Sequence, residues 1–157
     1  MASRYGQIVE ILAQRIANVD QINNVYAQEL YAANRNDFMT KFKTTFGLTE
    51  NVVQGWWFCI KKVETFIEEF DAETEVYPIQ LYGMLSLNTD NGSEERMINL
   101  VQGIRAAIND DLRLALPYYY DMNPAELVSL DDMVYGSGGA VHFAELHIRV
   151  TFKVPRG

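Results

Sequence analysis

The sequence feature that most constrains the fold is a regular alternation of side chains between residues 77 and 87. The odd positions of this stretch are apolar apart from a glycine: Tyr77, Ile79, Leu81, Gly83, Leu85 and Leu87. Successive side chains of a β-strand point to opposite faces, so a period of two predicts a strand with one buried face. Such a face needs a second layer to cover it, and the rest of the chain is expected to supply that layer.

The segment 93–112 is predicted to be an amphipathic helix that covers this strand. Its apolar residues recur at helical spacing: Met97, Val101, Ile104, Ile108 and Leu112. Ser93 is expected to cap the helix, and Glu94 and Glu95 fall in its first turn, where negative charge is favoured. Gly103 lies inside the helix and is expected to permit close approach to the sheet.

Two further segments are predicted to be strands of the same sheet. Residues 56–70 are rich in β-branched and aromatic side chains, and are expected to form a long antiparallel hairpin with the central strand over about residues 56–88. Residues 141–154 alternate cleanly. The face expected to be core carries His142, Ala144, Leu146, Ile148, Val150, Phe152 and Val154. The other face carries Glu145, His147, Arg149, Thr151 and Lys153.

The N-terminal part is predicted to add two helices and a short strand. Residues 3–17 have one apolar stripe at helical spacing, and residues 34–46 have phenylalanines on one side of a helix. A strand is expected at 24–29, and residues 48–55 are interpreted as a polar connector.

The region 112–135 is compatible with more than one structure. Pro117 ends the helical pattern, the three tyrosines at 118–120 can start a strand, and residues 124–135 fit either a strand or a helix start. The chain has no internal repeat or linker. We therefore predict one α+β domain over residues 1–157, with a mostly antiparallel twisted sheet packed by helices at about 3–17, 34–46 and 93–112.

Composition limits the classes of function. The chain has 157 residues and a net charge of −8 with only 13 Lys and Arg, which disfavours tight nucleic-acid binding but suits a wall past which DNA slides. No apolar run approaches the ~20 residues that span a bilayer, so no membrane partner is expected. The N-terminus lacks an apolar signal core, and no export signal is expected.

No catalytic, cofactor or metal motif is recognised. The glycine-rich segment 136–139 lacks the residues of a phosphate loop and is interpreted as a hairpin turn. His142 and His147 fall on opposite faces of their strand, so they cannot share a metal ion. Cys59 is the single cysteine and is interpreted as a small buried residue. The acidic pair at 131–132 is interpreted as a solvated turn or strand edge. The sequence therefore predicts a protein that is not an enzyme, with no cofactor and no metal.

Charges and aromatic residues on apolar strands are instead candidate contacts with other subunits, with a partner or with a lumen. The acidic hairpin tip contributes Glu68, Glu69, Asp71, Glu73 and Glu75. The charged face of the last strand contributes Glu145, His147, Arg149 and Lys153. Trp56 and Trp57 point to opposite faces, so that one is expected in the core and the other at a surface; Trp56 is taken as a candidate contact.

The order of elements resembles the tail terminator and tail-completion (neck) proteins of long-tailed bacteriophages. The likeness covers most of the chain and rests on architecture and short cues: Asn24-Val25-Tyr26, Asn36-Asp37-Phe38, Gly55-Trp56-Trp57, Tyr82-Gly83-Met84-Leu85 and the closing strand Ala144 to Phe152. Residues 118–135 fit the pattern least well.

The resemblance implies a structural virion protein, located in the neck or tail and assembled in the host cytoplasm. Such proteins form a homo-oligomeric ring, usually a hexamer, at the head-proximal end of the tail tube. The ring ends polymerisation of the tube protein and joins the tail to the head–tail connector or stopper protein. DNA passes through the lumen without specific binding.

Three alternatives stay open. A head–tail connector or stopper protein would have the same partners, and a helical structure for residues 112–135 would favour it, whereas strands there favour the terminator. A small-molecule-binding α+β protein would need an aromatic pocket formed by Trp56, Trp57 and residues 118–120. An enzyme is the third alternative, and no acid–base pair or nucleophile stands out for it.

Overall fold

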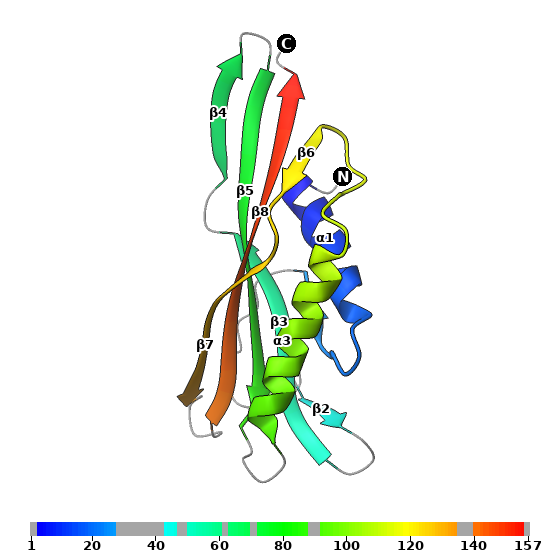
Figure 1. Cartoon of the computed structure of the whole chain (residues 1–157), viewed down its shortest axis with the longest axis vertical. Coiled ribbons are helices and arrows are strands. Elements are labelled where there is room, and N and C mark those ends of the chain that lie inside the picture. The colour runs from blue at the N-terminus through cyan, green and yellow to red at the C-terminus, as the bar shows by residue number, and fades with distance from the viewer. Residues whose placement is uncertain are drawn as a thin grey trace.

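A long antiparallel ribbon of two strands, β5 (Ala72–Ser86) and β8 (Ala140–Pro155), runs through the whole molecule (Figure 1). The two strands stay in register from the pair Ala72–Pro155 to the pair Ser86–Val141. The computed structural model describes residues 3–27, 43–46, 50–60, 63–69, 72–87, 92–134 and 140–155.

The remaining strands flank the two halves of this ribbon. They are β1 (Val25–Tyr26), β2 (Lys43–Phe46), β3 (Glu50–Ile60), β4 (Glu64–Glu69), β6 (Tyr119–Met122) and β7 (Glu126–Val134). Strands β3 and β4 pair antiparallel with β5, and β6 and β7 pair antiparallel with β8. Strand β1 is parallel to β3, and β2 is antiparallel to it. The predicted α+β domain with a mostly antiparallel twisted sheet is thereby confirmed.

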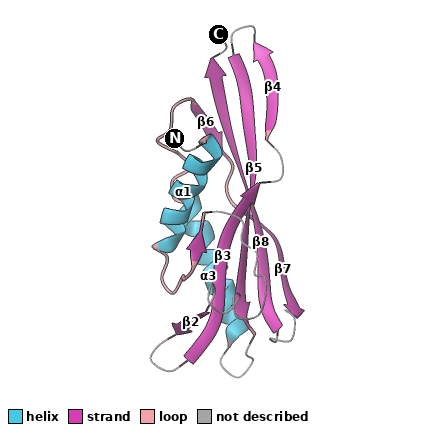
Figure 2. Ribbon diagram, turned by 180° about the vertical axis from the view of Figure 1, so that it is seen from behind, coloured by secondary structure: helices cyan, strands magenta, loops and turns pink. Residues whose placement is uncertain are grey.

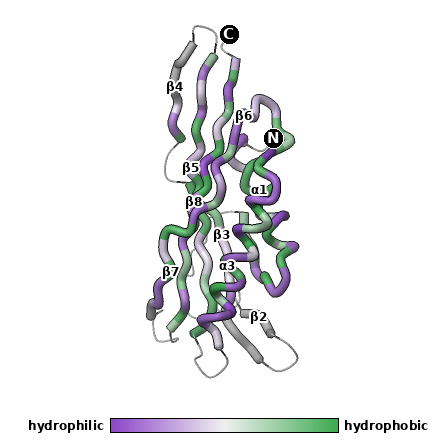
Figure 3. Tube along the Cα trace, viewed as in Figure 1, coloured by the Kyte–Doolittle hydropathy of each residue, from purple (hydrophilic) through white to green (hydrophobic). Residues whose placement is uncertain are grey.

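Two helices, α1 (Arg4–Ala17) and α3 (Ser93–Asn109), cover one face of the sheet, and in the view from behind β3 lies in front of α3 (Figure 2). Ser3 caps α1, since its Oγ accepts a hydrogen bond from the Gly6 amide at 3.0 Å. The apolar stripes of both helices are buried in one core with the odd positions of β5 and the even positions of β8. The alternation along β8 is visible as alternating hydropathy colours (Figure 3). We call this side of the sheet the helix face.

The glycine in the alternating stretch makes room for a tryptophan. Trp56 is fully buried on the helix face, directly opposite Gly83 in the register between β3 and β5. A Cβ atom at Gly83 would lie 2.1 Å from two carbons of the indole ring. The indole occupies the space that a side chain at Gly83 would need, which explains why the apolar pattern is interrupted at this position.

The segment 48–55, predicted to be a polar connector, is largely strand, because β3 begins at Glu50. Its most polar interior residue, Gln54, is fully buried but has hydrogen-bond partners. Gln54 Oε1 accepts from Trp56 Nε1 at 2.8 Å and from the Asn23 amide at 2.9 Å, while Gln54 Nε2 donates to the Gln21 carbonyl at 3.1 Å. A buried amide that is paired in this way costs little, so polarity did not exclude a strand here.

Other predicted boundaries also change. The helix predicted over 34–46 is wrong at its end, because residues 43–46 form β2 against the early part of β3; residues 34–42 lie outside the described residues. The predicted strand 56–70 is divided into β3 and β4, and their shifted registers with β5 show one additional residue on the β3–β4 side. Of the predicted strand 24–29, residues 25–26 form β1 and residues 28–29 are outside the described part.

The helix predicted over 93–112 ends at Asn109, and its glycine packs against a different element than expected. A Cβ atom at Gly103 would lie 2.8 Å from Val19 Cγ1, in the turn after α1, so the close approach is between α3 and that turn and not between α3 and the sheet. Residues 119–122 and 126–134 are strands, which decides between the two structures left open for the region 112–135.

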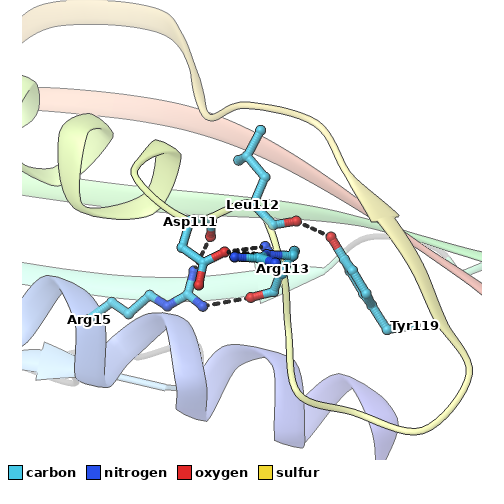
Figure 4. Close-up of polar contacts among 5 residues, drawn as sticks. All are labelled: Arg15, Asp111, Leu112, Arg113 and Tyr119. Carbon is cyan, nitrogen blue, oxygen red and sulfur yellow. Dashed lines mark hydrogen bonds and ion pairs between the residues drawn. The ribbon is translucent and has the colours of Figure 1, made fainter.

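Arg15 of α1 is hydrogen-bonded to the segment that follows α3 (Figure 4). Arg15 donates to the carbonyl oxygens of Asp111 at 2.6 Å and of Arg113 at 2.8 Å. The Asp111 carboxylate accepts from the side chain and the amide of Arg113, which lowers its pKa. Tyr119 Oη donates to the Leu112 carbonyl. These contacts position the chain for its entry into β6.

Candidate functional site on the far face of the sheet

The face of the sheet opposite the two helices, which we call the far face, carries side chains of mixed chemistry. Its central row is set by the register of three strands, where Trp57, Tyr82 and Glu145 lie side by side. The next rows place Cys59 beside Gln80 and His147, and Met84 beside Phe143. Aromatic, polar and charged groups thus lie side by side on neighbouring strands.

Three aromatic rings form a cluster on the far face. The ring centroids of Trp57 and Tyr82 are 6.0 Å apart, those of Tyr82 and Phe143 are 5.6 Å apart, and those of Trp57 and Phe143 are 6.1 Å apart. All three side chains are half-buried. Centroid distances of this size are favourable for aromatic pairs, so the cluster stiffens the far face.

The hydroxyl of Tyr82 is kept protonated by its surroundings. Burial raises its pKa well above the ordinary value of 10.0, and the nearby Cys59 and Glu145 raise the pKa further because each would repel a phenolate. The Cys59 thiol is buried, as predicted, and donates to Gln80 Oε1 at 3.3 Å. Glu145, the neighbour of Tyr82 in the register of β5 and β8, favours the protonated hydroxyl and places the aromatic cluster beside the charged strand.

The charged residues of β8 lie on the far face, as predicted, and pair with neighbours. His147 Nε2 is 3.0 Å from Glu145 Oε2, and Arg149 Nη2 donates to Glu64 Oε2 at 3.5 Å. The Lys153 ammonium lies 4.1 Å from the centroid of the Tyr120 ring. The side chains of His147 and Arg149 remain 45% and 51% exposed, so both can still contact another molecule.

A shallow groove of about 240 Å³ lies beside these charges, between the end of β6 and the start of β7. Its lining includes Pro78, Gln80, Glu126, His147 and Arg149. The groove therefore offers a carboxylate, a guanidinium and an imidazole to whatever covers it.

Trp56, predicted as a candidate contact, is a core residue. Its side chain has no exposed surface, because it packs on the helix face against Gly83. Its neighbour Trp57 is the tryptophan that reaches the far face. The sequence predicted that the two tryptophans lie on opposite faces but did not indicate which of them is buried. Trp56 is the buried one because Gly83 faces it and leaves room for the indole.

The acidic hairpin tip is only partly described. Glu68 and Glu69 belong to β4, and Asp71 lies outside the described residues. Glu73 is half-buried on β5. Glu75 forms an ion pair with Arg4 of α1 and accepts from Tyr77 Oη at 3.1 Å, so its carboxylate already has partners within the chain. The carboxylate of Glu75 thus fixes α1 to the ribbon.

The aromatic pocket of the small-molecule alternative does not form among the described residues. Trp56 is buried on the helix face, Trp57 lies on the far face, and Tyr118 and Tyr120 are exposed near the other end of β8.

Sequence reasoning missed one group of residues on the helix face. His142 is buried between Ser93 Oγ, 2.8 Å from Nε2, and Asp132 Oδ1, 2.7 Å from Nδ1. Ser93 is not the cap of α3, because Gly92 holds that position and Ser93 opens the helix. A histidine on the core side of a strand signals a need for polar partners. The sequence spacing, however, did not indicate that a helix start and an edge strand would supply them.

No model of a known protein family matches this sequence, and no curated protein matches it. Within the described part of the chain, neither helix is long and apolar enough to cross a membrane. The same residues contain no group of three or more His, Cys, Asp or Glu side chains arranged to hold a metal ion.

Proposed function

We propose that this chain is a structural subunit of a ring at the head-proximal end of a bacteriophage tail tube, where it ends tube polymerisation and joins the tail to the head connector. The proposal rests on the resemblance to tail terminator and tail-completion proteins. It also includes the partners which that resemblance implies: further copies of the chain in a six-membered ring, the tube protein and the connector or stopper protein.

The observation that carries the proposal is the chemistry of the far face. The half-exposed side chains of His147 and Arg149 lie close to the carboxylates of Glu64, Glu126 and Glu145. In a head-to-tail contact the far face of one copy would meet a different surface of the next copy, which is the kind of contact that closes into rings. Charges of both signs on the far face can fix the orientation of such a contact. The half-buried aromatic cluster beside these charges suits the centre of such an interface.

One further feature supports the terminator over the connector, and a second supports a ring that DNA crosses in either role. Residues 119–122 and 126–134 are strands, whereas a connector was expected to be helical there. The net charge of −8 suits a ring whose bore must not hold DNA, because like charges repel at close range.

The first test measures the mass of the purified protein, alone and mixed with tail tubes. A ring-sized species that binds to the ends of tubes supports the proposal, and a monomer that does not bind tubes contradicts it. The variant Arg149→Glu should weaken the ring, because it places a carboxylate beside Glu64. The variant Arg113→Glu is the matched control, since that arginine is highly exposed on the segment after α3 and away from the far face.

A second test concerns the acidic tip. Charge reversal at Glu68, Glu69, Asp71 and Glu73 to lysine should impair assembly and leave the subunit folded. Glu75 is kept as it is, because its ion pair with Arg4 fixes α1 and its reversal would confuse folding with assembly. Normal ring formation by the reversed protein would remove the tip from the set of contacts.

A further inference from the structure

Three side chains from three separate elements form a hydrogen-bonded chain where α3 begins, β7 ends and β8 begins (Figure 1). Ser93 Oγ is 2.8 Å from His142 Nε2, and His142 Nδ1 is 2.7 Å from Asp132 Oδ1. A hydroxyl next to one imidazole nitrogen, with a carboxylate on the other, is the order of groups that activates a serine for nucleophilic attack.

The carboxylate determines which nitrogen of His142 carries the proton. An ionised carboxylate only accepts hydrogen bonds, so Nδ1 carries the hydrogen and donates it to Asp132. The Nε2 atom then has a free lone pair and accepts the hydroxyl hydrogen of Ser93. This is the tautomer in which a histidine can take a proton from the serine.

The fold holds the three groups in place. His142 and Ser93 are almost fully buried, and Asp132 pairs directly with His142 in the register of β7 and β8. Gly92, with φ of 71° and ψ of 37°, turns the chain into α3 so that Ser93 is the first helical residue. The serine therefore opens α3, and the helix start holds its side chain against His142.

An open cavity of about 290 Å³ adjoins the chain and is lined by all three residues together with Glu94 and Glu95. The amides of the first helical turn have no carbonyl four residues earlier to bond. Among the described residues, the backward bonds of α3 begin at Arg96, whose amide donates to the Gly92 carbonyl at 3.1 Å. The amides of Glu94 and Glu95 are thus placed at a positive helix terminus beside Ser93, where they suit an oxyanion.

We infer that Ser93, His142 and Asp132 form a hydrolytic site for small carboxylic esters, with Ser93 as nucleophile, His142 as general base and acid, and Asp132 as the group that orients His142. Three carboxylates line the cavity, so uncharged or cationic esters fit it and anionic ones are repelled. This activity goes beyond the proposed ring and does not depend on it.

The reaction needs only the ester and water. Ser93 Oγ forms a bond to the acyl carbon while its proton moves to His142 Nε2. The bond from the acyl carbon to the alcohol oxygen then breaks, and that oxygen takes the proton from Nε2. A water molecule gives its proton to Nε2 and its oxygen to the acyl carbon, the bond to Oγ breaks, and Oγ regains the proton. One ester and one water give one acid and one alcohol.

Labelling with diisopropyl fluorophosphate tests the nucleophile directly, because an activated serine displaces fluoride and gains a phosphoryl group of known mass. We expect one group per chain, located at Ser93 by peptide mass analysis. Ser93→Ala should lose the label, and Asp132→Asn should slow labelling about 100-fold or more, because the imidazole loses its orienting carboxylate. Ser129→Ala is the matched control, since this serine lies on β7, the strand of Asp132, but in register with Glu145 on the far face.

Hydrolysis of 4-nitrophenyl acetate gives the second readout, and circular dichroism shows which variants are folded. We expect the wild type and Ser129→Ala to turn over the ester and Ser93→Ala and Asp132→Asn to lose the activity while remaining folded. A folded wild-type protein that is neither labelled nor active would overturn the inference and leave the three residues as a link between α3 and the sheet. Equal labelling of Ser93 in the wild type and in Asp132→Asn would overturn the assigned role of Asp132.

Discussion

The two faces of the sheet are built from the same strands but differ in the polarity and the burial of their side chains. On the helix face every central side chain of β5 and β8 is apolar and almost fully buried, apart from His142 and the space left at Gly83. On the far face the alternate residues of the same strands are mixed: aromatic, polar and charged side chains, many of them half-exposed, lie beside buried apolar ones such as Val76 and Met84. The core on the helix face thus requires an apolar side chain at every second residue of each strand. The residues between them are not restricted to apolar types.

The largest contrast between the faces should come from the adjacent tryptophans. Trp56→Ala removes a fully buried indole and leaves a cavity beside Gly83, so it should cost about 3–5 kcal/mol of unfolding free energy. Trp57→Ala removes a half-buried ring that contacts two other rings, and should cost about 1–2 kcal/mol. Urea unfolding of both variants measures the difference, and equal losses would contradict the distinction between the faces.

The sequence predicted the helix face well because its signal is periodic. The alternation in β5 and β8 and the apolar stripes of α1 and α3 each point to one buried side, and burial follows. Prediction failed where a tertiary partner decides: Gln54 is a strand residue because Asn23 and Trp56 satisfy its amide. For the same reason no sequence pattern could predict that Ser93 and Asp132 lie beside His142, because their proximity is set by the strand register and by the position of α3.

The next largest effect should follow a substitution at Gly83. In Gly83→Ala the added methyl group collides with the Trp56 ring, which cannot move within the core, so stability should fall by about 1–3 kcal/mol or more. Because both residues share one space, the double variant Gly83→Ala/Trp56→Ala should lose less than the sum of the single losses. Strict additivity in thermal or urea unfolding would show that the two residues do not compete for that space.

A moderate effect is expected from the one fully buried amide side chain of β3 in the described part of the chain. Gln54→Leu keeps the size of the side chain but removes the acceptor of Trp56 Nε1 and of the Asn23 amide, which should cost about 1–3 kcal/mol. Gln102→Leu is the matched control, because Gln102 is exposed on α3 and should change stability little. If both variants unfold at the same urea concentration, the buried amide does not stabilise β3 as described.

The smallest effect belongs to the far face and depends on pH. The pKa of Tyr82 is raised in the folded protein, so the folded state keeps the phenolic proton at a pH where the unfolded chain releases it. This contribution to stability is complete below about pH 10 and is lost as the pH rises above that value. In Tyr82→Phe the fall in unfolding free energy between about pH 9 and about pH 11 should therefore be shallower than in the wild type. Ile104→Val is the control for a general loss of stability, since Ile104 lies in the core of the helix face and its loss should lower stability by a similar amount at every pH and leave the slope unchanged. An unchanged alkaline slope in Tyr82→Phe would show that the far face does not keep this hydroxyl protonated.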